Sequence, residues 1–201
     1  MVVDINLNNK SFDESFYIIN NSVQEAFHNF EMNILLSKYN FLQENGVILE
    51  EAEESKKQNF IQKCKQFITN FVETLKRKVK ELKQKAADKV KEIKEKIKQK
   101  KFDKELQEVF DKADSDLNKY ETEVYDDFST WVTVENAKLD KMLNNNDRFI
   151  EADFTVQEVV ETNKAKEAWN KFANNMKSKV NEVKKKSETS SNSNEKSLVP
   201  A

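Results

Sequence analysis

The sequence predicts an all-α protein, an elongated helical bundle with a long, lysine-rich, coiled-coil-like helix and a disordered C-terminal tail. Its 201 residues include one glycine, Gly46, and one proline, Pro200. This nearly excludes β-rich folds, which need turn residues roughly every 8–12 positions, and glycine-rich nucleotide sites. The charged fraction of 35% exceeds the usual value of about 25% and is typical of long helices. Fourteen Phe and two Trp argue against full disorder.

The N-terminal region predicts one helix. Residues 1–10 are polar and rich in asparagine, and we expect them to form an arm. Ser11 and Glu14 have the spacing of a capping box, which starts a helix over 11–45. Asn45-Gly46 ends it, because glycine readily adopts the left-handed conformation after a helix. The apolar positions expected on its core face are Val23, Phe27, Phe30, Ile34, Leu35, Tyr39 and Leu42.

A long helix is predicted over residues 55–101, with Ser55 and Gln58 as a second capping-box candidate. Such a helix would be roughly 65–70 Å long. Its first part is broadly apolar, and its second part narrows to a seam with a spacing near 3.5 residues, the value of coiled coils. We expect this seam to contact other helices, including those of a partner, through Val72, Leu75, Val79, Leu82, Ala86, Val90, Ile93 and Ile97.

The second half predicts shorter helices. Asp126 to Thr130 resembles a break, with Ser129 or Thr130 available to cap the helix that follows. Thr155 and Glu158 form a third capping-box candidate, and Trp131 and Trp169 are the large apolar anchors expected in the core. The expected elements are helices over 104–126, 130–143 and 155–186 and a flexible, Ser/Asn-rich tail over 187–201.

Charge alternates in blocks along the chain. Residues 1–54 carry 2 basic and 10 acidic side chains, and residues 55–104 carry 18 and 6. Residues 105–165 carry 6 and 16, and residues 166–201 carry 8 and 4. The formal net charge of −2 therefore hides a strongly basic helix between two acidic segments. Antiparallel packing would place these blocks side by side and neutralise much of the basic charge within the fold.

The basic stretch 76–101 could also bind a polyanion, because clustered cations release counterions from phosphates. However, 32 of the 34 basic residues are lysines, whereas phosphate and base recognition favours arginine. Acidic residues interrupt the stretch in helical pairs such as Glu81 and Lys85. A paired or solvated face is therefore favoured over nucleic acid, and a membrane surface is favoured least. The candidate polyanion contacts are Lys76, Arg77, Lys78, Lys80, Lys83, Lys94 and Lys98.

The sequence predicts no catalytic, cofactor-binding or metal site, and we expect the protein not to be an enzyme. One Cys and one His cannot build a zinc site, and one Cys cannot form an intrachain disulfide. His28 lies between Phe27 and Phe30, and we expect it near the core in a structural role. Cys64 lies on the apolar stripe of the long helix and is expected to be a small buried hydrophobe. The acidic clusters lack the loop of an EF-hand.

Two stretches carry a family resemblance, one reading ILLSKYNFLQENGVILEEA and the next FITNFVETLKRKVKELKQK. Over roughly residues 30–100 they resemble small virion-associated proteins of large tailed bacteriophages, which pair a short N-terminal helix with a Lys/Phe-rich amphipathic helix. The resemblance implies a structural or internal component of a capsid or tail, without catalytic residues. Its partners would be further copies or other virion proteins. The C-terminal half has no counterpart in this family.

The expected location follows from the resemblance and from targeting signals. The N-terminus has no apolar run behind a basic start, so we expect no secretory signal peptide. No stretch approaches 18 uncharged apolar residues, so we expect no transmembrane helix. The predicted location is the virion if the chain is viral, and the cytoplasm otherwise.

Overall fold

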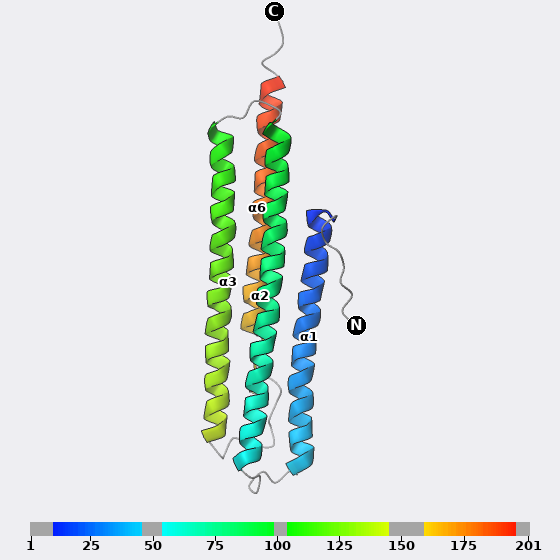
Figure 1. Cartoon of the computed structure of the whole chain (residues 1–201), viewed down its shortest axis with the longest axis vertical. Coiled ribbons are helices and arrows are strands. Elements are labelled where there is room, and N and C mark those ends of the chain that lie inside the picture. The colour runs from blue at the N-terminus through cyan, green and yellow to red at the C-terminus, as the bar shows by residue number, and fades with distance from the viewer. Residues whose placement is uncertain (1–9, 46–53, 99–103, 145–158, 196–201) are drawn as a thin grey trace, which may run out of the picture. The chain divides into compact units, whose positions relative to one another are not determined.

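The computed structural model describes residues 10–45, 54–98, 104–144 and 159–195, and it confirms an all-α protein. These residues form four helices and no strand (Figure 1). The helices are α1 (Phe12–Asn45), α2 (Glu54–Lys98), α3 (Lys104–Asn144) and α6 (Asn163–Glu195). Within the described residues, none of the helices contains an apolar stretch that could cross a bilayer.

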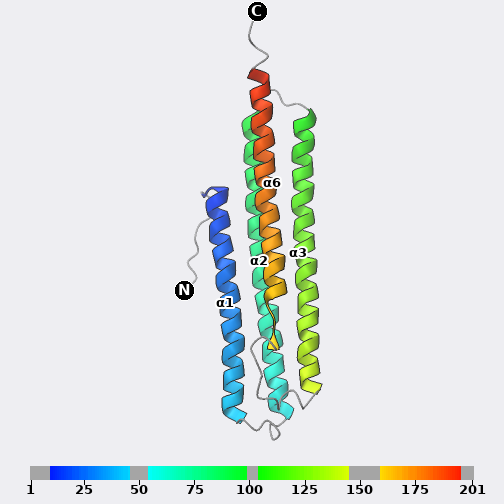
Figure 2. The ribbon, with the colours of Figure 1, turned by 180° about the vertical axis from the view of Figure 1, so that it is seen from behind.

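The chain divides into two compact units, and each of the four helices has part of its length in each unit. Unit 1 comprises Met1–Asn21, Lys78–Val124 and Asn170–Ala201, and unit 2 comprises Ser22–Arg77 and Tyr125–Trp169. Figure 2 shows the same helices from behind. Each unit has a core of its own, described below.

The start of α1 confirms the predicted capping box. The backbone N–H of Glu14 donates to Ser11 Oγ at 3.3 Å, and the backbone N–H of Ser11 donates to Glu14 Oε2 at 3.0 Å. These bonds satisfy two backbone donors that have no partner inside the helix. The helix accordingly begins at Phe12, whose side chain is buried.

In unit 1, buried side chains recur at helical spacing on α2, α3 and α6, and α1 adds its first turns. Long apolar side chains three or four residues apart share one face of a helix, so each segment offers one stripe to the core. Because each stripe is narrow, charged residues occupy the positions on either side of it. The main core residues of unit 1 are Phe12, Ile19, Val79, Leu82, Ala86, Val90, Phe110, Ala113, Leu117, Phe172, Met176, Val180 and Val183.

In unit 2, the core is built on aromatic rings. The ring of Phe71 on α2 stacks on Phe30 of α1, with centroids 4.4 Å apart, and meets Phe27 edge-on at 4.9 Å. Trp131 of α3 lies edge-on to Phe71 at 6.1 Å. The indole N–H of Trp131 donates to the backbone carbonyl of Glu161 at 2.6 Å, so its polar end is satisfied as well. Trp131 and Trp169 are both buried, as the sequence predicted.

The predicted break between residues 126 and 130 is wrong, because α3 continues through it. Ser129 does not cap a new helix; its Oγ donates to the Tyr125 carbonyl four residues earlier, at 2.8 Å. Thr133 makes the same bond to the Ser129 carbonyl at 2.9 Å. The polar run is therefore the exposed face of one helix, while Phe128 on the opposite face is buried.

Other helix boundaries also differ from the predicted ones. The helix predicted over 155–186 begins at Asn163 and ends at Glu195, so much of the predicted flexible tail is helical. Ser187 is buried and its Oγ donates to the Val183 carbonyl at 2.6 Å, which suits a helix interior. The second helix begins at Glu54, so Ser55 lies inside it rather than at its cap. The Thr155–Glu158 capping box, Gly46 and residues 99–101 lie outside the described residues.

Candidate interaction surface

The predicted partner seam on α2 lies inside the fold. Seven of its eight residues are buried, Val72 and Leu75 in unit 2 and the rest in unit 1, while Ile97 is half-buried. The period of 3.5 residues correctly marked a helix packing face, but that face packs within the chain. The seven buried side chains form part of the core, so they are not free to meet a partner as predicted.

Most of the candidate polyanion contacts have neighbours within the chain. Lys83 pairs with Glu121 of α3 at 2.5 Å, and Lys94 lies 5.6 Å from the centre of the Phe110 ring. Lys76 and Lys78 pair along α2 with Glu73 and Glu81, at 3.0 and 2.8 Å. Among the described residues, Arg77 and Lys80 are exposed and have no ion-pair partner, and the side chain of Lys98 lies outside the description.

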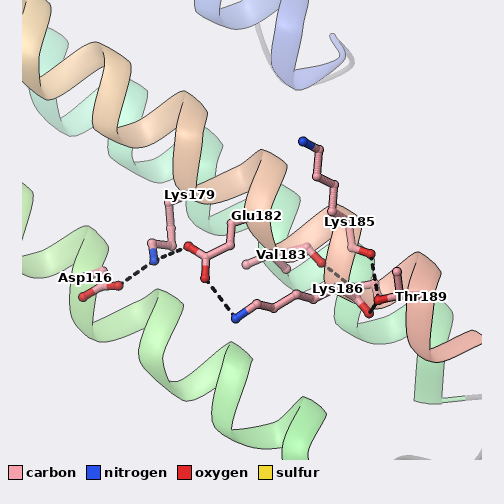
Figure 3. Close-up of polar contacts among 8 residues, drawn as sticks. Asp116, Lys179, Glu182, Val183, Lys185, Lys186 and Thr189 are labelled. Atoms are coloured by element: carbon pink, nitrogen blue, oxygen red, sulfur yellow. Dashed lines mark hydrogen bonds and ion pairs between the residues drawn. The ribbon is translucent and has the colours of Figure 1, made fainter.

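A charged cluster joins α6 to α3 in unit 1 (Figure 3). The Lys179 ammonium lies 2.7 Å from Asp116 and donates to Glu182 at 2.7 Å, while Lys186 pairs with Glu182 at 3.2 Å. Burial lowers the pKa of Lys179, but its bonds to the two carboxylates outweigh this effect and hold the pKa above its ordinary value. The hydrogen bond from Lys179 lowers the pKa of Glu182. These ion pairs hold α6 against α3, and the charged groups of the cluster are paired with one another.

A second polar cluster joins α1 to the start of α6 in unit 2. Lys166 donates to Glu31 at 2.7 Å, and the Thr162 hydroxyl donates to the same carboxylate. Burial raises the pKa of Glu31, but these hydrogen bonds outweigh it and the pKa lies below its ordinary value. Nearby, the buried Glu135 accepts from the backbone N–H of Glu161 at 3.2 Å. Both carboxylates therefore serve to anchor residues 161–166.

A cavity of about 590 Å³ lies in unit 1 where α1 begins, against α2 and α6. Its lining holds three basic and three acidic side chains, so it has no excess charge to select an ion. Lys89 and Lys96 both pair with Glu92, at 2.9 and 2.5 Å, and their hydrogen bonds lower the pKa of that carboxyl. The charges around this cavity are therefore largely matched by one another.

Cys64 and His28 lie in different environments. Cys64 is fully buried, as predicted, and burial raises the pKa of its thiol to about 12. His28 is exposed, which corrects its expected place near the core. Within the described part of the chain, no group of three or more His, Cys, Asp or Glu side chains could hold a metal ion.

The surface that stands out is on α1, in unit 2. Met32, Leu35, Leu36 and Tyr39 are exposed by 39, 40, 51 and 60%. Their spacing of three and four residues places them on one side of the helix. Leu35 and Tyr39 were expected in the core, but the core side of α1 continues instead through Ile34, Ser37, Lys38 and Phe41. We call Met32, Leu35, Leu36 and Tyr39 the exposed α1 face.

The exposed α1 face has uncharged surroundings. Between His28 and Gln43, none of the exposed residues is Asp, Glu, Lys or Arg. The two charged residues in this range are Lys38, which is buried, and Glu31, which is bound by Lys166. In a chain with 35% charged residues, four helical turns whose charged residues are one buried lysine and one ion-paired glutamate are unusual. Contiguous exposed apolar side chains are candidates for an interaction site. Leu35 and Tyr39 were predicted on the core face of α1, whereas no face was predicted for Met32 and Leu36.

Comparisons of the chain with known protein families, with curated proteins and with solved structures found no match. The resemblance to virion-associated phage proteins therefore stays a prediction based on roughly residues 30–100.

Proposed function

We propose that the chain is a non-enzymatic structural or assembly protein that acts through helix–helix contacts with another protein. We further propose, from the family resemblance alone, that it is a virion component. The observation that supports the assembly role is the exposed α1 face, with four large apolar side chains. The charged residues between positions 28 and 43 are Lys38, which is buried, and Glu31, which is half-buried and paired with Lys166. An apolar, uncharged helix face fits an equally apolar helix of a partner.

The buried α2 seam leaves α1 as the surface for such contacts. Removing apolar side chains from water is the main favourable term in protein association, and a few residues near the centre of an interface carry most of the binding energy. Leu36 and Tyr39 are the most exposed members of the face, so they are the best candidates to dominate binding. Lys76, Lys78 and Lys83 form ion pairs within the chain. Less unpaired basic charge is therefore available to bind a polyanion, the alternative partner.

The test compares Leu36→Asp with a matched control, Val134→Asp, which alters another exposed apolar residue of unit 2, on α3. Immobilised wild-type and variant chains are incubated with an extract of the cells or particles that naturally contain the protein. Each bound protein is then purified and rebound alone, at low salt and at about 1 M NaCl, where the Debye length is about 3 Å. We expect at least one purified protein to bind wild type and Val134→Asp in high salt, but not Leu36→Asp.

Two results would contradict the assembly role. One is that no purified protein, including further copies of the chain, binds in a way that depends on Leu36. The other is that the bound material is nucleic acid, released by salt and reduced by Arg77→Gln and Lys80→Gln but not by Leu36→Asp. That second result would establish the polyanion alternative, since phosphate binding falls steeply with salt.

A further inference from the structure

We infer that the occupant of the exposed α1 face is a second copy of this chain, packed antiparallel about a two-fold axis near residue 37. This inference rests on the proposed function and names the partner. A two-fold interface uses the same patch on both copies, so the patch must be complementary to itself. A charged patch would repel its own copy, whereas the exposed residues from His28 to Gln43 carry no Asp, Glu, Lys or Arg.

The spacing of the face fits a two-helix seam. Met32, Leu35 and Tyr39, followed by the half-buried Leu42, recur with the alternating three- and four-residue steps of a coiled coil. In an antiparallel pair about residue 37, Met32 faces Leu42 of the second copy and Leu35 faces its Tyr39. Leu36 then lies beside the axis, close to Leu36 of the second copy. Every large apolar residue of the face therefore has an apolar partner.

Charge favours the antiparallel over the parallel arrangement. Glu25 is exposed and lies seven residues before Met32, in line with the seam. A parallel pair would place Glu25 against its own copy, and juxtaposed like charges oppose association. In the antiparallel pair the two Glu25 residues lie roughly 36 Å apart along the helices, at about 1.5 Å per residue.

The same features argue against a membrane surface as the occupant. Helices that lie in a bilayer interface carry lysine or arginine beside their apolar face to meet anionic headgroups. The exposed residues beside this face are His28, Asn29, Asn33, Asn40 and Gln43, and none of them is lysine or arginine. Amides of this kind can hydrogen-bond across a protein interface but do not attract anionic lipid.

The size of the exposed α1 face determines how stable a dimer we expect. Residues 28–43 span about 24 Å of helix. One helix of this length buries less than the roughly 800 Å² per partner of a standard stable interface. We therefore expect a reversible dimer that dissociates on dilution, rather than a permanent one.

The test uses introduced cysteines to determine which residues of the two copies lie opposite each other. Cys64 can remain, because it is buried and its pKa is raised to about 12. Met32→Cys and Leu42→Cys chains, one of them carrying an affinity tag, are oxidised separately and as a mixture. In the inferred register, residues 32 and 42 of opposite copies are in contact, whereas equal residues lie about 15 Å apart along the axis. That distance is too great for a disulfide.

We expect a disulfide-linked dimer in the mixture and little from either variant alone. Its formation should be lost when Leu36→Asp is added to both chains and retained with Val134→Asp. Linkage of each variant with itself would indicate a parallel pair and overturn the inference, as would no linkage in any sample. If no disulfide-linked dimer forms in any sample, but another purified protein binds through Leu36, the inference fails and the assembly role stands. If no protein binds through Leu36, both fail.

Discussion

Ile34 and Leu35 are adjacent in α1, yet the side chain of Ile34 is 1% exposed and that of Leu35 is 40% exposed. Successive residues of a helix differ by about 100° in direction, so these two side chains belong to different faces. The Ile34 side holds the core of unit 2, with Phe27, Phe30 and Phe41. The Leu35 side is the exposed α1 face. One helix therefore carries both a core face and a second apolar face that the described residues leave exposed.

This relationship predicts opposite effects from the same substitution at neighbouring positions. Ile34→Asp buries an unpaired carboxylate and should cost several kcal/mol of unfolding free energy. Leu35→Asp places the charge in water and should change the stability of the monomer by less than about 0.5 kcal/mol. Urea unfolding, followed by circular dichroism at low protein concentration, measures both. Equal destabilisation by the two variants would contradict the assignment of the faces.

The continuity of α3 predicts a strong effect at Ser129. Ser129→Pro removes a backbone donor and places the ring against the preceding turn, so it should cost about 3 kcal/mol or more. Ser129→Ala serves as the control, because Ser129 is exposed and alanine favours a helix. Urea unfolding of both variants checks this. If Ser129→Pro were as stable as Ser129→Ala, the helix would be broken at this point.

The cluster around Lys179 predicts a pH-dependent contribution to stability. The lowered pKa of Glu182 makes its contribution present above the ordinary value of 4.5 and lost as the pH falls. The raised pKa of Lys179 makes its contribution present below the ordinary value of 10.5 and lost as the pH rises further. Between these limits the cluster should stabilise the fold at a constant level.

Lys179→Met tests this contribution. Bonds to charged groups are worth roughly 1.5–3 kcal/mol. We expect about 1 kcal/mol, because Glu182 is 39% exposed and water screens its charge. Lys185→Met is the matched control, since its side chain points away from Asp116 and Glu182 (Figure 3). Urea unfolding across pH should show a difference between the two variants that is level near neutral pH and shrinks in acid. A difference that grows in acid would contradict the assignment.

Cys64 is predicted to be unreactive in the native protein. Its thiol is buried and has a pKa of about 12, so little thiolate forms near neutral pH. A thiol reagent should label Cys64 only after urea unfolds the chain, and the absorbance of the released chromophore follows the reaction. Rapid labelling of the native protein would show that the core of unit 2 opens locally at α2.

Much of the fold could be predicted from the sequence, because long helices leave regular patterns. The Ser11–Glu14 capping box, the helical packing period of α2 and the burial of the two tryptophans were predicted correctly. The break at Ser129 was wrong because a run of polar residues looks alike in a loop and on an exposed helix face. In the structure, the hydroxyl groups of Ser129 and Thr133 donate to backbone carbonyls of the preceding turn, as expected on a helix. Such bonds depend on the backbone conformation and are not visible in the sequence.

The candidate interaction surface was harder to predict for a different reason. Periodicity identifies a helix face only when apolar residues lie on one side, and α1 carries them on two. Phe71 and Trp131 cover the Phe30 side of α1 from positions distant in the sequence, so the pattern of α1 could not show which side is covered. For the same reason, the pairing of Lys179 with Asp116 was not predictable.

Sedimentation velocity over a range of concentrations tests self-association through the exposed α1 face most directly. Wild type, Leu36→Asp and Val134→Asp are compared in about 1 M NaCl, where charge interactions are screened. We predict that wild type and Val134→Asp shift from monomer to dimer as the concentration rises, while Leu36→Asp stays monomeric. A wild-type chain that stays monomeric at every concentration, or a dimer that Leu36→Asp leaves intact, would contradict self-association through the exposed α1 face.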